Sequence, residues 1–311
     1  MSEQSPVTAD LSLGSRAESG PTRRPTKAAL KGWIYLAPAL VIYLSFAVWP
    51  ALNTLHLSLL DWDGVGVPEW VGLDNYLQIV RDPALYSSIG NALLLIVFFS
   101  VIPVIIGLAM TGLLLGKVRR GMTFFRTVFF LPQVLPLVAV GITWRWLYAE
   151  SGAVNQLLDI IGLGFLTRAW LGDYDLALYA LGLIGAWTMS GLCMMLFLSG
   201  AQRIDASLYE AATLDGAGAF RQFVSVTVPG VRKEITIASV ITTIAALASF
   251  DLVFVTTNGG PADQTTVPAL LVYRLAFNEG DIGTASALAI TLTALVIGFV
   301  ALIRRIARED D

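Results

Sequence analysis

A polar loop between long apolar runs holds the residues whose types and spacing carry the clearest chemical message. Its parts are Glu210, Ala211, Ala212, Asp215 and Gly216, followed further along by Pro229. The alanines and the glycine are small, so another surface can approach the backbone closely. We interpret the loop as a docking surface for a partner.

The same loop predicts a short amphipathic helix. Ser207 and Glu210 have the spacing of a reciprocal capping box, which predicts a helix start at Ser207. Apolar and small residues then recur at helical spacing on one face, namely Tyr209, Ala212, Gly216, Ala219, Phe220 and Phe223. Pro229 is expected to end any helix before the next apolar run. The alternative is a helix packed against its own protein.

Other chemistry finds little support, and we expect no catalytic residue and no metal site. The single His56 has no cysteine or second histidine near it with which to bind a metal, so packing or hydrogen bonding explains it best. Cys193 is the only cysteine, which excludes disulfides within the chain and favours a buried filler. Residues 112–118 lack the spacing and the hydroxyl of a phosphate-binding loop, so no ATPase is encoded here.

The composition places these residues in a membrane protein. The 311 residues are 56% hydrophobic and only 14% charged, and the mean hydropathy is +0.71. A bilayer-spanning helix needs roughly 20 mostly apolar residues. Six stretches meet this need, so the predicted fold is all-α with six transmembrane helices, at about residues 33–60, 88–116, 126–148, 176–200, 235–257 and 282–303.

Polar groups inside these spans are the candidates for a solute pathway, because they are costly in lipid and usually face a cavity or another helix. Gln133 lies between Pro132 and Pro136, where freed backbone carbonyls suit a helix that lines a cavity. The other candidates offer aromatic faces, hydroxyls or a carboxylate, and they are Trp144, Trp187, Ser190, Thr242, Thr243, Ser249 and Asp251. Ordinary packing and interhelix hydrogen bonds remain the alternative for each, and for Asp251 we favour a structural role near Thr256 and Asn258.

The distribution of charge predicts how the chain crosses the membrane. Basic residues in short loops stay on the cytoplasmic side. They cluster before the first span and after the second, fourth and sixth, whereas the alternate loops are mainly acidic. Both termini and the loop at about 201–234 are therefore expected in the cytoplasm. Residues 1–31 contain few large apolar side chains and are expected to form a disordered cytoplasmic tail before the transmembrane domain at 32–311.

The loop spacing resembles a known family pattern: E-A-A, three residues, Gly, nine residues, Ile or Val, one residue, Leu, Pro. Only Val228 departs, because it replaces the leucine. Asp205 stands where the family usually has proline, and aspartate is itself a good helix cap. Further similar stretches are YLAPAL at 35–40, GLDNY at 72–76, FLP to WRWLY at 130–148, and FD to TNGGP at 250–261. The chain resembles binding-protein-dependent ABC importer permeases of the carbohydrate-uptake group, which contains the maltose and glycerol-3-phosphate systems.

The resemblance implies the type I permease fold and a division of labour. This chain would pair with a second, different permease in the bacterial or archaeal inner membrane. An ATPase dimer, which binds ATP and magnesium, would dock on residues 207–229, and an extracytoplasmic binding protein would deliver a sugar or related solute. The chain itself would bind no cofactor and no nucleic acid. The alternatives are an ion-coupled secondary transporter and a membrane-embedded enzyme, and neither has the clustered residues it needs.

Overall fold

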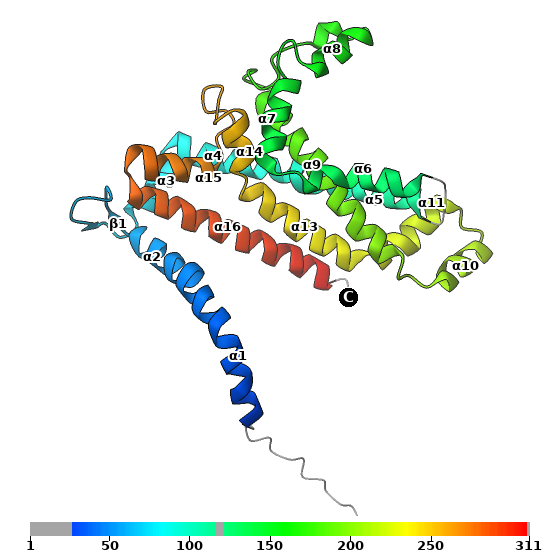
Figure 1. Cartoon of the computed structure of the whole chain (residues 1–311), viewed down its shortest axis with the longest axis horizontal. Helices are drawn as coiled ribbons and strands as arrows, with labels where there is room; N and C mark the ends of the chain where they lie inside the picture. The colour runs from blue at the N-terminus through cyan, green and yellow to red at the C-terminus, as the bar shows by residue number, and fades with distance from the viewer. Residues whose placement is uncertain (1–26, 116–120, 310–311) are drawn as a thin grey trace, which may run out of the picture. The chain divides into compact units, whose positions relative to one another are not determined.

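The computed structural model describes residues 27–115 and 121–309, and helices make up most of the described part (Figure 1). The chain separates into two compact units, residues 1–51 and 52–311. The first unit contains α1 (Lys27–Tyr43), the π-helical turn η1 (Leu44–Val48) and the start of α2 (Trp49–Leu57). Residues 1–26 of the predicted tail lie outside the described residues, and α1 already begins at Lys27.

The helical path from residue 35 to residue 57 meets the length and hydropathy requirements of a membrane span, yet none of it is buried. Tyr35 is 85% exposed and Phe46 is 81% exposed. Apolar side chains of this size need lipid or another protein surface as their surroundings.

The second unit begins with a hairpin and a long helical path. Strands β1 (Leu60–Asp61) and β2 (Glu69–Trp70) pair antiparallel, with Leu60 opposite Trp70. The Asp63 carboxylate accepts hydrogen bonds from the amides of Val65 and Gly66 in the connecting turn, and these bonds lower the pKa of Asp63. The elements that follow are α3 (Asp74–Arg81), α4 (Pro83–Ile96), η2 (Val97–Val101) and α5 (Ile102–Leu114).

Helix α9 (Ala177–Ala201) is the central element of this unit, and most of its apolar stretch is buried. Glycines let its neighbours come close. A Cβ atom at Gly107 of α5 would lie 2.7 Å from Cys193 Cβ, and one at Gly191 would lie 2.3 Å from the Phe129 carbonyl oxygen. Cys193 is fully buried in this packing, which confirms the prediction that it fills space.

Two predicted spans are broken in the structure. The third consists of α6 (Met122–Val134) and α7 (Leu137–Leu147), which meet at a bend of 101°. Leu135 is extended there because the ring of Pro136 disfavours a helical conformation in the preceding residue. The fifth consists of α13 (Arg232–Leu247) and α14 (Asp251–Thr256). One continuous helix in each of these spans was therefore a wrong expectation.

The number of spans is smaller by strict criteria than the predicted six. Among the described residues, four helices are long and apolar enough to cross a membrane, and the bent pair α6–α7 makes five. Helix α13 has only 16 residues before its break. The all-α membrane fold is confirmed, and the count of six stays a prediction.

The polar loop and the β-hairpin lie at opposite ends of the second unit (Figure 1). The polar loop contains α10 (Ala206–Leu214), α11 (Ala219–Gln222), η4 (Phe223–Thr227) and α12 (Val228–Gly230). Figure 1 shows this loop at one end of the second unit and the β-hairpin with α3 at the other. The other elements are α8 (Ala153–Ile160), η3 (Gly164–Leu166), α15 (Pro268–Arg274), η5 (Leu275–Glu279) and α16 (Ile282–Glu309).

Candidate functional site

The polar loop begins with a capped helix. Asp205 is extended, and its Oδ1 accepts a hydrogen bond of 2.9 Å from the Ser207 amide. That bond lowers the pKa of the Asp205 carboxyl. Asp205 is therefore the cap of α10, as expected for a good capping residue. The prediction of a capping box that starts at Ser207 is wrong, because Ser207 already lies inside the helix.

Gly216 ends α10. Its φ of +78° is left-handed, a conformation that glycine adopts without steric cost. The Ala217 amide donates to the Ala212 carbonyl at 2.9 Å, and the Gly216 amide donates to the Thr213 carbonyl at 3.0 Å. This is a Schellman motif, which satisfies the last carbonyls of the helix. A single amphipathic helix through residue 223 was therefore a wrong expectation.

The second half of the loop folds back onto the first. Gln222 donates to the Thr213 hydroxyl at 3.0 Å, and the hydroxyls of Tyr209 and Thr227 lie 2.9 Å apart. Pro229 lies within α12, which is capped at Val231. The helix thus ends one residue after Pro229 and before α13 begins at Arg232, in line with the prediction that it stops before the next apolar run.

Helix α10 offers a surface rather than a core. None of its residues is buried. Leu208 is 53% exposed and Leu214 is 89% exposed, and Phe220 of α11 is 80% exposed. Glu210, Ala211, Asp215 and Gly216 are exposed, and Ala212 is half-buried. The structure thus brings these predicted docking residues together on one short helix, whereas Pro229 lies apart from them on α12. The exposed large apolar side chains beside them favour contact with a partner surface.

A cavity of about 360 Å³ lies among α5, α6 and α9. Two predicted pathway residues line it, Trp187 and Ser190, together with Pro132. The Ser190 hydroxyl donates to the Ala186 carbonyl at 2.6 Å, so its oxygen still has acceptor capacity. The rest of the lining includes Ile102, Ile106, Val128 and Phe129. These four were missed, because a nearly continuous apolar run gives no signal that singles them out.

Two more predicted residues adjoin residues that line this cavity, although they do not line it themselves. The Trp144 ring meets the Trp187 ring edge-on at 5.5 Å between centroids. Gln133 follows Pro132, and its Oε1 atom is buried without a hydrogen-bond partner. A buried acceptor without a partner is rare and costly. Gln133 thus has an unused acceptor next to Pro132, and its pathway role stays a prediction.

The other predicted pathway residues lie elsewhere. Thr242 and Thr243 donate to the Ser100 hydroxyl at 2.7 Å and 3.3 Å, the interhelix hydrogen bonds of the alternative interpretation. Ser249 lies at the break between α13 and α14, and its hydroxyl oxygen is buried without a partner. Asp251 is exposed in the first turn of α14, where a carboxylate suits the helix dipole.

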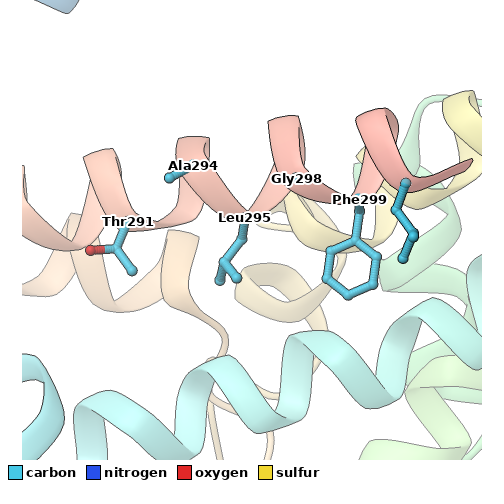
Figure 2. A pocket seen from close by; sticks show the side chains of 6 residues that line it. Thr291, Ala294, Leu295, Gly298 and Phe299 are labelled. Atoms are coloured by element: carbon cyan, nitrogen blue, oxygen red, sulfur yellow. The ribbon is translucent and has the colours of Figure 1, made fainter. Parts of the chain in front are cut away.

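A second, apolar groove of about 350 Å³ follows α16. Figure 2 shows Thr291, Leu295 and Phe299 projecting from the same side of the helix. The Thr291 hydroxyl already donates to the Ala287 carbonyl at 2.8 Å. With so little hydrogen-bonding capacity, this groove suits apolar side chains or lipid rather than a sugar.

A helical membrane unit with an exposed polar loop at one end and a cavity among its helices is typical of a transport permease. Residues 104–308 match the family described as binding-protein-dependent transport system inner membrane component. The chain belongs to this family, which confirms the resemblance seen in the loop.

Individual relatives agree. The chain is 37% identical to the probable ABC transporter permease protein YurN of Bacillus subtilis, over 85% of this chain and 91% of that protein. It is 32% identical to the trehalose/maltose transport system permease protein MalF of Thermococcus litoralis, over 89% and 93%. It is also 32% identical to the diacetylchitobiose uptake system permease protein NgcF of Streptomyces coelicolor, over 86% and 80%.

The fold has also been observed experimentally. A crystal structure of a bacterial ABC transporter that imports alginate contains a chain with a TM-score of 0.76 to this one, at 20% identity, covering 91% of this chain and 96% of that one. The chain is a permease subunit of an ABC importer, and its relatives are permease proteins.

Proposed function

We propose that this permease forms half of the membrane pathway of an ABC importer for a sugar or related solute. The relatives that act on trehalose and maltose or on diacetylchitobiose support the class of solute. A second permease would complete the pathway. An extracytoplasmic binding protein would deliver the solute, as suggested by the alginate transporter in complex with its periplasmic protein. The comparisons give the ion-coupled alternative no support.

We propose that the ATPase docks on α10. The supporting observation is that α10, at one end of the second unit, has no buried residue. An ATPase groove would receive Leu208, Leu214 and Phe220, while the small Ala211 and Gly216 allow close approach. The ATPase dimer would bind ATP and magnesium, and this chain would bind neither. ATP-driven closure of that dimer would pull on α10 and change which side of the membrane the cavity faces.

We infer that the cavity among α5, α6 and α9 is part of the solute path. Aromatic faces at Trp187 and Trp144 suit the apolar face of a sugar ring, and Ser190 and Gln133 offer acceptors to its hydroxyls. The inner membrane is the expected location. The basic residues in the α10 loop, and those before the first and after the sixth apolar run, support a cytoplasmic location for that loop and for both termini.

The test of coupling is Gly216→Trp. No atom lies within 4 Å of a Cβ atom at Gly216, so a tryptophan side chain finds open space there. Its large side chain would hold the ATPase away from α10 and remove contacts that depend on close fit. We expect the ATPase to be lost when the importer is purified through the permease. Hydrolysis of ATP stimulated by the binding protein should fall to the background.

The matched control is Gly216→Ala. Both substitutions impose the left-handed strain, roughly 1–2 kcal/mol for a non-glycine residue, but alanine adds only a methyl group. Alanine should retain the ATPase and most of the stimulation. Wild-type ATPase binding and stimulation in Gly216→Trp would show that the partner docks elsewhere.

A further inference from the structure

Helix α3 presents a row of exposed apolar side chains at the β-hairpin end of the second unit. Leu73, Leu77 and Val80 recur at intervals of four and three residues, which places them on one side of the helix. Leu73 is 66% exposed, Leu77 is 46% exposed and Val80 is 73% exposed. We call these three residues the apolar row of α3, and the described part of the chain leaves it largely uncovered.

A polar row lies beside the apolar row on the same helix. An open cavity of about 530 Å³ is lined by Asp74, Gln78, Arg81 and Asp82. The Thr284 hydroxyl of α16 donates to Gln78 Oε1 at 3.1 Å. Its oxygen is therefore engaged, while the two N–H donors of the Gln78 amide are available to another partner.

Arg81 differs from the other arginines of the mainly acidic loops. These loops contain Arg81, Arg168 and Arg274. Arg168 forms an ion pair with Asp173 at 3.5 Å, and Arg274 forms one with Asp263 at 2.7 Å. Within residues 27–115 and 121–309, no ion pair engages Arg81, which is exposed in the last turn of α3. Its charge is therefore available to a partner.

Together, Arg81 and Gln78 have the donors that a carboxylate needs. They are three residues apart, so both side chains lie on the same side of α3. A guanidinium binds a carboxylate through two parallel hydrogen bonds, and the Gln78 amide adds further donors. The neighbouring Asp82 is already engaged, because its Oδ1 caps α4 by accepting from the Ala84 amide at 2.8 Å.

The fold anchors α3 on its other side. Asn75 donates from Nδ2 to the Ser58 carbonyl at 3.0 Å and to the Leu60 carbonyl at 2.9 Å. The hydroxyls of Tyr76 and Ser58 lie 2.7 Å apart, and Ile79 is only 4% exposed in an apolar cluster under the helix. A helix held in this way loses little freedom when a partner binds its outer side.

Charge and length place these rows in water rather than in lipid. Charged side chains along one side of α3 are costly in hydrocarbon. The helical path Pro83–Leu114 has 32 residues, which gives a length of about 48 Å against roughly 30 Å for the hydrocarbon core. Helix α3 joins this path at its outer end. In water, an apolar row next to polar groups and an arginine has the composition of a protein interface.

We propose that the outer face of α3, made of its apolar row with Gln78 and Arg81, docks the extracytoplasmic binding protein. Arg81 and Gln78 bind a carboxylate on the surface of that protein, and the apolar row contacts an apolar patch beside it. The inference rests on the proposed transport function and adds the surface and the chemistry of one contact. Attraction by Arg81 mainly speeds association and fixes the orientation of the docked protein.

The first test changes the charge of Arg81. The assembled importer is placed in lipid nanodiscs, and the stimulation of ATP hydrolysis is followed against the concentration of its binding protein. We expect Arg81→Glu to raise the half-saturating concentration roughly tenfold, because repulsion replaces attraction. Arg81→Lys should raise it only about twofold, because lysine keeps the charge but lacks the planar fork. An unchanged value in Arg81→Glu overturns the proposal.

The second test uses a matched pair of substitutions at exposed apolar positions. Val80 of α3 is 73% exposed, and Ile160 of α8 is 81% exposed, so a glutamate at either position remains in contact with solvent. We expect Val80→Glu to raise the half-saturating concentration roughly tenfold and Ile160→Glu to leave it within about twofold. An equal change in both variants, or a change in Ile160→Glu alone, shows that the binding protein does not dock on α3.

The third test identifies what contacts the apolar row. The photo-crosslinking residue p-benzoylphenylalanine takes the place of Leu77, and the importer is illuminated with its binding protein present. We expect a covalent product with the binding protein. A product with the second permease instead, or no binding-protein product while hydrolysis is stimulated, contradicts the proposal.

Failure of the proposed transport function gives a different result. If the importer uses no binding protein, the unchanged permease shows no stimulation at any concentration. If only the docking surface is misplaced, the unchanged permease is stimulated and the α3 variants behave in the same way.

Discussion

At the scale of single residues, hydrogen-bond satisfaction separates pathway candidates that look alike in sequence. Thr243 has a partner on a neighbouring helix, whereas the Oε1 atom of Gln133 has none although it is buried. A group that serves only packing has no reason to keep an unsatisfied acceptor, because that acceptor costs about 1–3 kcal/mol. Gln133, rather than Thr243, is therefore the pathway candidate chosen for a test.

Gln133→Leu tests whether Gln133 binds solute or only packs, because the two roles predict different changes in thermal stability and in solute uptake. The leucine fills similar space without a buried acceptor, so the thermal stability of the purified permease should stay the same or rise. Uptake of the solute that the binding protein binds should fall at least several-fold. Uptake kinetics would be followed beside a melting curve of the same preparation, with Thr243→Val as the comparison. Normal uptake by Gln133→Leu would show that Gln133 only packs between helices.

At the scale of elements, local residues set the ends of α10, whereas contacts with distant residues hold the loop around it. Asp205 begins the helix, Gly216 ends it, and the Tyr209–Thr227 hydrogen bond holds the returning segment against it. The proposed docking surface is therefore a short capped helix that the loss of a single cap residue can loosen.

Asp205→Ala should fray the first turn of α10 and weaken ATPase binding, whereas Asp205→Asn should retain most of it, because asparagine also caps well. Co-purification of the ATPase with increasing salt would measure the difference. Since the pKa of Asp205 is lowered in the fold, the capping contribution of its charge is present above the ordinary value of 3.8 and is lost as the pH falls through the lower value. Equal binding by the alanine and asparagine variants would show that the cap is unimportant for docking.

At the scale of the whole molecule, the alternation of basic and acidic loops predicts opposite sides for the α10 loop and the α7–α8 turn. In a Cys193→Ala background, a cysteine at the exposed Ser151 should react with an impermeant thiol reagent added outside intact cells. A cysteine at Leu214, which is 89% exposed, should react only after the membrane is opened. Labelling of both positions from outside would disprove the orientation.

The sequence by itself determined the membrane class, the helical fold, the polar loop between apolar runs and the family. These properties depend on composition, on the length of apolar runs and on short spacings, which can be read from neighbouring residues. The proline at position 136 was visible, but neither the 101° bend nor the second break at 248–250 was.

Only the tertiary structure decided where helices end and which polar groups have partners. Asp205 rather than Ser207 caps α10 because the backbone is extended at residue 205. Ser100 satisfies Thr242, although 142 positions separate them in the chain, while Gln133 Oε1 and Ser249 Oγ stay without partners. Such partnerships arise when distant helices pack, and periodicity within one segment carries no information about them.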